Sequence, residues 1–279
     1  MGIEIFGLTY CEVFIMLKTK QNETINIHQE IPAIYIPGKR ELPVVLMAHG
    51  IMGSKNEYLD TQARISEKLE CYNMASLRID FCGHGDSHRD LQDFSLFSQI
   101  QDLADSIQWL TDKKYSSVIL LGISFGAPPA IIISSLHSQI VKKCVLIAPV
   151  TDYQKTFVFP MTSWGKENFG LNQILSGIRC AGIKLDEDYI LSPRVLTDML
   201  LVDIPTFIRN TCLNISIFHG DCDDMVPYST SKAMCDLGKN ISLYTMHNTE
   251  HGLTEVGDEN FSSCISTRNL EKVIDEICQ

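Results

Sequence analysis

A serine flanked by glycines is the residue of this chain best placed to act as a nucleophile. The pentapeptide GISFG at residues 122–126 follows the apolar run 118–121 and precedes the apolar run 130–133. This order predicts a buried strand, a sharp turn and a helix, with Ser124 at the turn and its hydroxyl projecting above the sheet. A serine beside glycines also occurs in ordinary turns, so a catalytic interpretation requires further groups in the chain.

Such a serine becomes nucleophilic only with a base that takes its proton and an acid that orients the base. At a nucleophile elbow the acid and then the histidine are expected downstream of the serine. Three aspartates, Asp221, Asp223 and Asp224, lie in the segment 219–227 (HGDCDDMVP), after the strand-like run 213–217. Asp221 starts a turn and is expected to accept hydrogen bonds from local backbone N–H groups. Asp224 is expected to face solvent or to shape the next turn.

The candidate base is His251, in the segment 249–253 (TEHGL) after the strand-like run 241–246. Its rival is His247, which directly follows that run, and a histidine at a strand end is more often structural. A glycine after His251 gives its loop the freedom to aim the imidazole ring. We therefore expect His251 to take the serine proton.

Two further loops carry histidines that could be mistaken for catalytic groups. The loop 49–54 (HGIMGS) follows an apolar strand-like run, and the segment 78–87 (RIDFCGHGDS) begins with another. His49 is expected to bond backbone groups and to shape its loop rather than to transfer a proton. His84 and Asp86 are expected to hold the architecture of their own loop.

Five segments in this order resemble the motifs of the α/β-hydrolase superfamily. The segment 78–87 resembles the R-x-D-x-x-G-H-G-x-S stretch of the branch with cinnamoyl and feruloyl esterases, monoglyceride lipases and S33-type peptidases. The resemblance covers about residues 40 to 150 and 210 to 279. It implies an α/β-hydrolase fold, in which a mostly parallel central sheet is flanked by helices and carries a lid insertion.

The same resemblance implies roles for individual residues. The setting H-G-x-x-D-x-x-V-P resembles the acid loop of many α/β-hydrolases, which makes Asp223 the acid. The H-G loop suggests that the backbone N–H groups of Ile51 and Phe125 form the oxyanion hole.

The chain departs from these relatives around the elbow. Many of them have histidine where this chain has Ile123 and a second glycine where it has Ala127, and neither position carries a proton in the mechanism. Proline deep in a helix removes a backbone donor and crowds the preceding turn. Pro128 and Pro129 therefore predict a distorted first turn, which could alter the oxyanion hole and the turnover rate.

Composition is typical of an enzyme built as one large α/β domain over residues 1–279. The chain is 45% hydrophobic, and its net charge of −11 and pI near 5.1 argue against binding to nucleic acid. No apolar run approaches the roughly 20 residues that span a bilayer, and the start carries no basic region of a signal peptide. We expect a cytoplasmic protein without an integral membrane segment, and the sequence makes no prediction of its oligomeric state.

Ten cysteines are scattered along the chain without a C-x-x-C pair. This pattern indicates neither a disulfide framework nor a metal site, so no metal and no cofactor are expected. Most of the cysteines are expected to be reduced, small core residues, and Cys222 to be accessible beside the acid.

Periodicity predicts the elements that position these groups. Antiparallel edge strands are expected within residues 10–36, at 13–17 and 33–36. Further strands are expected at 43–48, 78–81 and 143–148, and a closing helix at 261–278. The spacing of Ile100, Leu103, Ile107 and Leu110 predicts the core face of a helix. Strands and helices thus alternate, as a parallel sheet requires.

The alternation lapses between about residues 150 and 210. This interval contains Phe157, Phe159, Met161, Trp164, Phe169, Leu171 and Ile174, with glycines between them. It is expected to form a lid over Ser124, with most of these aromatic residues in its own small core. Trp164 is the candidate for a wall of an acyl pocket.

Together these features predict a serine hydrolase that cleaves a carboxylic ester with an apolar or aryl acyl group. His251 would deprotonate Ser124 and Asp223 would orient the imidazole, with an acyl-enzyme intermediate. The partner would be a small-molecule ester or thioester. An acyltransferase or a thioesterase with the same triad is the first alternative. A binding protein on a hydrolase fold is the second, although such proteins often lose a catalytic residue.

Overall fold

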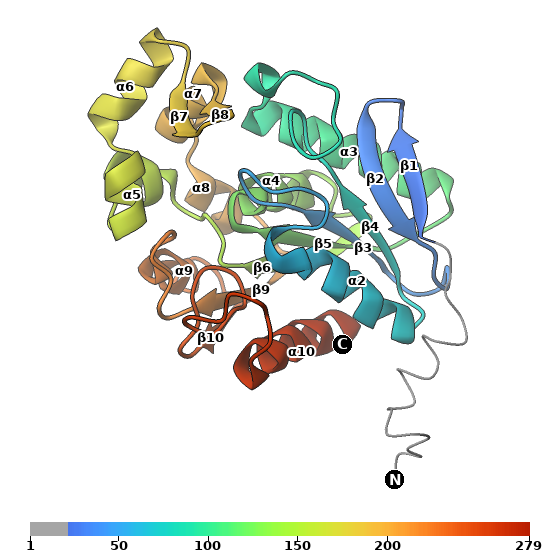
Figure 1. Cartoon of the computed structure of the whole chain (residues 1–279). Helices are drawn as coiled ribbons and strands as arrows, with labels where there is room; N and C mark the ends of the chain where they lie inside the picture. Colours follow the sequence, from blue (N-terminus) through green and yellow to red (C-terminus); the bar gives the residue numbers. More distant parts are fainter. Residues whose placement is uncertain (1–21) are drawn as a thin grey trace.

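An eight-stranded sheet forms the centre of the molecule (Figure 1). The computed structural model describes residues 22–279. Along the sheet the strands follow the order β1-β2-β4-β3-β5-β6-β9-β10; β1 and β2 are antiparallel, as are β2 and β4, and the other pairs are parallel. The strands are β1 (Glu23–Ile27), β2 (Ile31–Ile36), β3 (Val44–Ala48), β4 (Ala75–Ile79), β5 (Val118–Ile123), β6 (Val141–Ile147), β9 (Asn214–Gly220) and β10 (Ile241–Met246).

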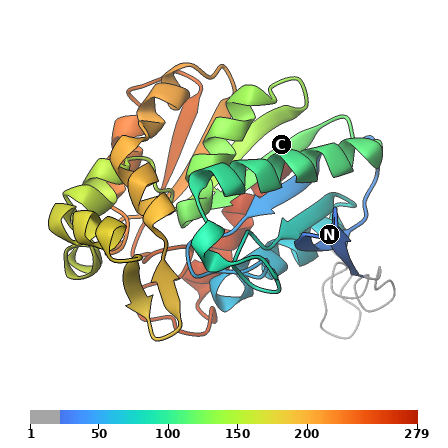
Figure 2. The ribbon, with the colours of Figure 1, turned by 90° about the horizontal axis from the view of Figure 1, so that it is seen from above.

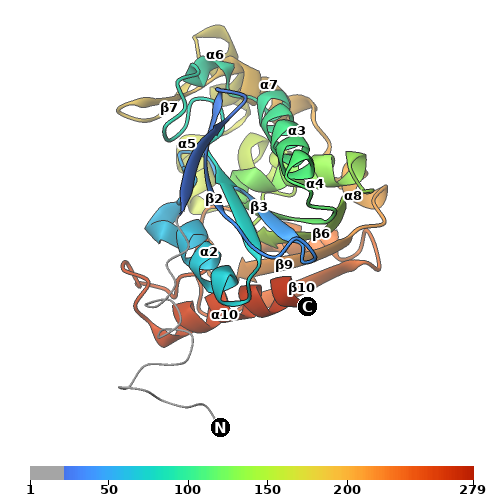
Figure 3. The same cartoon turned by 90° about the vertical axis from the view of Figure 1, so that its right-hand side faces the viewer.

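Helices cover both faces of this sheet. The helices α3 (Leu96–Asp112), α4 (Ala127–Leu136) and α8 (Ile204–Arg209) lie on one face, whereas α2 (Thr61–Cys71) and α10 (Cys264–Cys278) lie together on the other (Figure 3). The short helix α9 (Tyr228–Met234) contacts β9 and β10. Because both faces are covered, β3 and β5 are apolar from end to end, and all their residues are buried.

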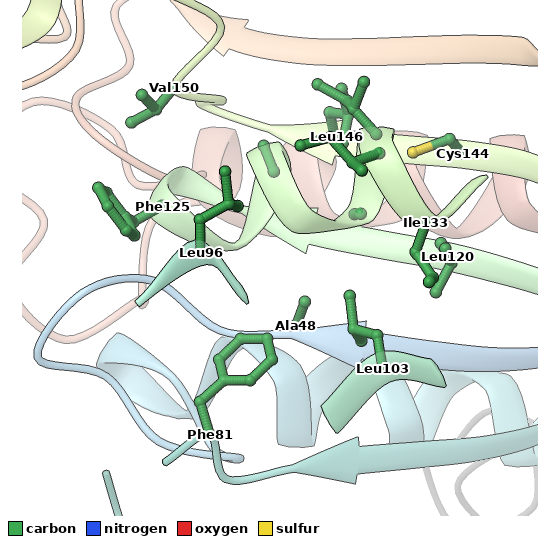
Figure 4. Close-up of a cluster of buried hydrophobic side chains, with 14 of the residues drawn as sticks. Ala48, Phe81, Leu96, Leu103, Leu120, Phe125, Ile133, Cys144, Leu146 and Val150 are labelled. Carbon is green, nitrogen blue, oxygen red and sulfur yellow. The ribbon is translucent and has the colours of Figure 1, made fainter. Parts of the chain in front are cut away.

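The larger of two buried clusters fills the space between the sheet and the pair α3 and α4. Figure 4 shows Ala48, Leu120 and Leu146 from three neighbouring strands together with Leu103 of α3 and Ile133 of α4. Burial of one large aliphatic side chain stabilises the fold by about 1.5–3 kcal/mol. This packing fixes the strand ends from which the candidate catalytic loops leave.

The fold class and most of the predicted elements are confirmed, with shifted ends. The run 241–246 is β10, and the closing helix begins at Cys264 because the Ser263 side chain caps it by accepting from the Ser266 N–H. The strand expected at 78–81 is β4, which begins and ends earlier. Polar residues of β4 interrupt the apolar pattern by which a buried strand is recognised. One of them is the buried Arg78, which donates to the Asn56 side chain at 2.6 Å.

Other predicted elements differ more in their outcome. The strand expected at 33–36 is part of β2, whereas the strand expected at 13–17 lies outside the described residues. In α3 the predicted core face holds, because Leu103, Ile107 and Leu110 are buried.

The helical segment that follows β5 begins with a 3-10 turn, η3 (Ser124–Gly126), and continues as an α-helix from Ala127. The distortion expected from the two prolines is not observed within that α-helix. Helix α4 runs from Ala127, with Gly126 as its N-cap, so Pro128 and Pro129 occupy its first turn. The N–H groups of a first helical turn have no intrahelical partner, and proline loses nothing there.

Between β6 and β9 the chain leaves the sheet and forms an insertion, residues 148–213. Its elements gather at one end of the sheet (Figures 1 and 2). They are η4 (Gln154–Val158), α5 (Ser163–Asn168), α6 (Leu171–Arg179), the antiparallel hairpin of β7 (Ile183–Asp186) and β8 (Tyr189–Leu191), α7 (Pro193–Leu201) and α8.

The insertion has no separate core among the described residues. The rings of Phe157 and Phe169 lie 4.8 Å apart, and Phe157 lies 5.8 Å from Phe125 beneath it, so its buried residues continue the main cluster. The expectation that most of its aromatic residues form a small core of the insertion's own is wrong, because those that are buried belong to the main cluster. Phe157, Phe169 and Ile174 are buried, Trp164 is half-buried, and Phe159, Met161 and Leu171 are exposed. Elements this short cannot enclose all their apolar side chains.

The cysteines also depart from expectation. Of the eight free cysteines in the described part of the chain, Cys82 and Cys144 are buried and five, including Cys222, are exposed. Cys71 is disulfide-bonded. Several exposed cysteines stand at helix ends, where a side chain meets solvent rather than the core. Within residues 22–279 no group of three or more His, Cys, Asp or Glu side chains has an arrangement that could hold a metal ion.

In the same part of the chain, no helix combines the length and apolar character needed to cross a bilayer.

Candidate active site

The structure places Ser124 on a strained turn at the carboxyl end of β5. Its φ of 51° lies in the left-handed region, which costs a non-glycine residue roughly 1–2 kcal/mol. The flanking glycines permit the turn: a Cβ on Gly126 would lie 2.4 Å from the Ala48 carbonyl oxygen, and one on Gly122 would lie 2.8 Å from the Gly126 carbonyl oxygen. The turn therefore requires glycine on both sides of the serine.

The side chain of the next residue anchors this turn in the core. The Phe125 ring lies 5.6 Å from Tyr153 and 6.1 Å from Phe94, measured between centroids. Because Phe125 is fully buried, its backbone N–H is held at the start of the elbow, beside Ser124.

Three sequence-predicted residues meet at the carboxyl ends of parallel strands. His251 Nε2 lies 2.9 Å from Ser124 Oγ, and His251 Nδ1 lies 2.8 Å from Asp223 Oδ2. The residues come from the loops after β5, β9 and β10. With Asp223 ionised, Nδ1–H donates to the carboxylate and Nε2 accepts from the serine hydroxyl. This is the tautomer that can take the serine proton.

Four N–H groups converge on the carboxylate of Asp223. Oδ2 accepts from His251 and from His219 Nε2 at 3.0 Å, and Oδ1 accepts from the backbone N–H groups of Met225 at 2.9 Å and Val226 at 2.8 Å. Burial disfavours the ionised carboxyl, yet the charges and hydrogen bonds of His251 and His219 hold the pKa of Asp223 below its usual range. The acid is thus held as a carboxylate.

His219 is a residue whose contact with the acid the sequence reasoning missed. It lies fully buried in β9, one residue before the strand ends, and its Nδ1 accepts from the Ser231 hydroxyl at 2.7 Å. This bond fixes the tautomer that donates to Asp223. The available signal was its position four residues before the acid in the H-G-x-x-D motif.

The pKa of His251 is shifted in the opposite direction from that of Asp223. Burial disfavours its imidazolium, but the charge of Asp223 and the hydrogen bond to it hold the pKa of His251 above its usual value. Glu57 and Asp224 contribute negative charge in the same direction. The imidazolium form of His251 is therefore stabilised.

The rival acids and base lie apart from this network. His247 Nδ1 pairs with Asp221 Oδ2 at 2.9 Å on the surface, and Asp221 Oδ1 accepts from the Asn248 N–H. Asp224 is exposed at the rim of the cavity. Neither Asp221 nor His247 contacts Ser124, His251 or Asp223 in the described structure.

His84 and Asp86 hold loop structure. His84 Nδ1–H donates to the Cys82 carbonyl, and its Nε2 accepts from the Tyr189 hydroxyl of β8 at 2.8 Å, which ties the insertion to the sheet. Asp86 accepts from Lys55 Nζ at 2.6 Å at the surface.

His49 holds the loop 49–54, which we call the oxyanion loop. Its Nε2 accepts from the Phe81 N–H at 3.0 Å, and its Nδ1–H donates to the Gly50 carbonyl at 2.7 Å. Burial lowers the pKa of His49 to about 3, so the ring is neutral. The Gly50 carbonyl also accepts from the Gly53 N–H at 3.2 Å. The Gly50 carbonyl and the Ile51 N–H belong to one trans peptide group, in which the two point in opposite directions. The bonds to the carbonyl therefore direct the Ile51 N–H away from His49 Nδ1 and the Gly53 N–H.

A carboxyl group that the sequence reasoning missed lies beside this loop. Glu57 Oε2 accepts from the Gly50 N–H at 2.6 Å, and Oε1 accepts from the Tyr58 N–H at 3.1 Å. Desolvation raises the pKa of Glu57. Eight residues after His49, it had no motif to mark it.

A cavity of about 700 Å³ opens above Ser124. Its apolar lining consists of Ile51, Met52, Ile123, Ile147, Trp164, Met225 and Leu253. Three carboxyl-bearing residues, Glu57, Asp224 and Glu250, also line it, and its described lining contains no Lys or Arg. Trp164 is the insertion's residue in this wall, and its ring lies 5.4 Å from Phe169.

Comparisons with known proteins agree with this architecture. The family model described as the alpha/beta hydrolase fold matches residues 43–177. The structure of Est1E from Butyrivibrio proteoclasticus with bound ferulic acid is similar, with a TM-score of 0.71 and 18% identity over 100% of both chains. The chain has the α/β-hydrolase fold. The resemblance drawn from its motifs is thereby confirmed at the level of the fold.

Further hydrolases share this α/β-hydrolase fold. An esterase from Exiguobacterium antarcticum has a TM-score of 0.66 and 15% identity, over 93% of this chain and 100% of that chain. A bacterial membrane phospholipase A has a TM-score of 0.64 and 15% identity, over 93% of this chain and 87% of that chain. Among curated proteins, no sequence match to the chain is found.

Proposed function

We propose that this protein is a serine hydrolase that cleaves carboxylic esters through an acyl-enzyme intermediate. The observation that carries the proposal is the hydrogen-bonded series from Ser124 through His251 to Asp223, on a strained turn beneath a cavity. The α/β-hydrolase fold and the esterases that share it support hydrolysis in general.

The first half of the reaction follows from the positions of the hydrogen-bonded atoms. His251 Nε2 takes the hydroxyl proton of Ser124 as Oγ attacks the ester carbonyl carbon, and Asp223 stabilises the resulting imidazolium. The N–H groups of Ile51 and Phe125 are the proposed donors to the oxyanion. The intermediate collapses when the carbon–oxygen bond to the leaving alcohol breaks, and the alcohol oxygen takes the proton from His251.

In the second half, water replaces the alcohol. His251 removes a proton from water as the water oxygen attacks the acyl carbon. The bond to Ser124 Oγ then breaks, the proton returns to the serine, and the carboxylic acid leaves.

The cavity supports an apolar or aryl acyl group as the substrate class. Its walls are mostly carbon, and Trp164 contributes a flat aromatic surface from the insertion. Est1E, which shares the fold, binds ferulic acid, an aryl acid, in its structure. We further propose that residues 150–210 act as a lid, with Trp164 as its contact to the acyl group.

Covalent labelling with a fluorophosphonate tests the proposal. We expect rapid labelling of the wild-type protein at Ser124, located by mass spectrometry, and none in Ser124→Ala. Ser229→Ala is a matched control, since that serine is exposed on α9 and does not line the cavity. A folded wild-type protein that is not labelled would show that the site is not catalytic and would favour a binding role.

A substrate panel then tests the reaction type. It should contain p-nitrophenyl esters of increasing acyl length, methyl ferulate, an acyl thioester, and an added alcohol as an acyl acceptor. Ester hydrolysis should dominate. A faster reaction with the thioester, or transfer to the alcohol, would identify a thioesterase or an acyltransferase instead.

A further inference from the structure

Glu57 places a carboxyl group in the catalytic cavity that the triad mechanism does not use. It is half-buried, it lines the same cavity as Ser124 and His251, and both of its oxygens accept backbone N–H groups. One of these donors is Gly50, at the base of the oxyanion loop. The carboxyl is thus built into the site rather than extended from its rim.

The backbone around Glu57 is held in an unusual conformation. Its φ of 65° with ψ of 171° is a region that glycine normally occupies, and such a residue costs of order 1–3 kcal/mol. The Glu57 N–H donates to the Ser54 carbonyl at 2.8 Å, which fixes the turn. A Cβ on Gly53 would lie 2.9 Å from Glu57 Oε1, so the loop leaves just enough room for the carboxyl.

Glu57 also contacts the part of the oxyanion loop that lies beside Ser124. A Cβ on Gly50 would lie 3.2 Å from Ser124 Cβ and 3.6 Å from Glu57 Oε2. Gly50 is therefore close to both the nucleophile and the carboxyl. A bond to its N–H restrains the peptide chain that carries the Ile51 N–H.

The charged groups around the cavity decide what this carboxylate can do. The cavity that Glu57 lines is also lined by His251 and Glu250 from the loop after β10 and by Asp224 from the loop after β9. On its own loop, Lys55 is paired with Asp80 and Asp86 at 2.6 Å each. The partner of opposite charge that remains for Glu57 in the described cavity is the imidazolium of His251.

We propose that Glu57 is a positioning residue of the catalytic site. Its carboxylate holds the Gly50 peptide of the oxyanion loop and, together with Asp223, supplies negative charge that stabilises the imidazolium of His251. The inference rests on the proposed serine-hydrolase function, since it assigns the residue a part in that reaction.

Titration of His251 by NMR in the full-length protein tests the charge without requiring turnover. Histidine ring carbons are labelled, and the His251 signal is assigned with His251→Gln. Glu57→Gln should lower the His251 pKa by about half a pH unit or more, because a neighbouring opposite charge raises it. Glu57→Asp should restore part of this shift. Glu271→Gln is the control, as it removes one exposed carboxylate of α10, far from the cavity.

The second readout is reaction with a fluorophosphonate and with p-nitrophenyl acetate. If the His251 pKa falls by about half a pH unit, the imidazolium that forms in the transition state is stabilised less. The rate of Glu57→Gln should then be about threefold lower. Glu57→Ala should lose more, because the Gly50 and Tyr58 N–H groups are left without an acceptor. If Glu57→Gln fails to fold, Glu57→Asp is tested in its place. Its His251 pKa and its labelling rate should then differ from those of the wild-type protein.

The outcomes separate the two hypotheses. An unchanged or higher His251 pKa in Glu57→Gln, with unchanged labelling, overturns the role of Glu57. A wild-type protein that resists labelling overturns the proposed function, whereas the titration still reports the charge effect.

Discussion

Replacing Asp223 by Asn should remove most of the activity, whereas the same change at Asp224 should remove little. Asp223 accepts four N–H groups, two on each oxygen. An Asn side chain has one oxygen, so in either orientation its NH2 group faces two donors. Asp224 is exposed and contributes charge to His251 from the cavity rim. The pair is therefore a matched test of the acid.

The magnitude follows from the lost hydrogen bonds. Two bonds to a charged group at about 1.5–3 kcal/mol each amount to about 3–6 kcal/mol. If the transition state loses all of this hydrogen-bond energy, the rate falls roughly a hundredfold to ten-thousandfold, since each tenfold change in rate corresponds to about 1.36 kcal/mol. Loss of the correct His251 tautomer favours the upper end, since an Asp-to-Asn change in a serine triad lowers kcat by about 10^4. Asp224→Asn should lose about twofold, as for a surface change of about 0.5 kcal/mol.

The assay is kcat/KM for p-nitrophenyl acetate at pH 8, with circular dichroism and the thermal midpoint as controls for folding. Both variants are compared with wild type at a temperature well below their midpoints. If Asp224→Asn loses more activity than Asp223→Asn while both remain folded, the acid assignment is wrong.

Three further predictions concern the base, its support and the lid. The acidic limb of the kcat/KM profile should have its midpoint above pH 6.5, because Asp223 raises the pKa of His251. Only the neutral imidazole accepts the serine proton. A flat profile from pH 5 to 8 would exclude this base. His219→Gln should move the acidic limb upward, because Asp223 loses the N–H donor of His219 and its charge then acts more strongly on His251. A lower thermal midpoint with an unmoved limb would make His219 purely structural. Trp164→Ala should lower kcat/KM more for long or aryl acyl esters than for acetate, whereas an equal loss for all acyl groups with reduced thermal stability would assign Trp164 to packing with Phe169.

The central strands and the elbow could be predicted because short-range rules determine them. Strands buried on both faces, such as 118–123, are apolar throughout, and a turn as tight as that at Ser124 requires the glycines on both sides of it. The strand at 75–79 was placed too late because Ser76 and Arg78 interrupt its apolar pattern. The guanidinium of the buried Arg78 donates to the distant loop residues Lys55 and Asn56, and the local sequence gives no sign of these partners.

The supporting residues of the site could not be predicted, because their partners are distant or lack a motif. His219 pairs with Ser231 through the docking of α9, and Glu57 reaches Gly50 only through a loop with positive φ angles. The two prolines of α4 were misjudged for a different reason. Their effect depends on where the helix begins, and the sequence does not locate that residue within one position.

The hydrogen bond between His251 and Ser124 joins residues 127 positions apart, and in the described sheet β10 has β9 as its one neighbour. At about 5–20 residues per second, a ribosome synthesises the base roughly 6–25 s after the nucleophile. A nascent chain therefore carries the serine turn for most of that time without a group to activate it. The proposed esterase activity would be acquired only when the last strand pairs, so fluorophosphonate labelling of this protein would also report the completion of its folding.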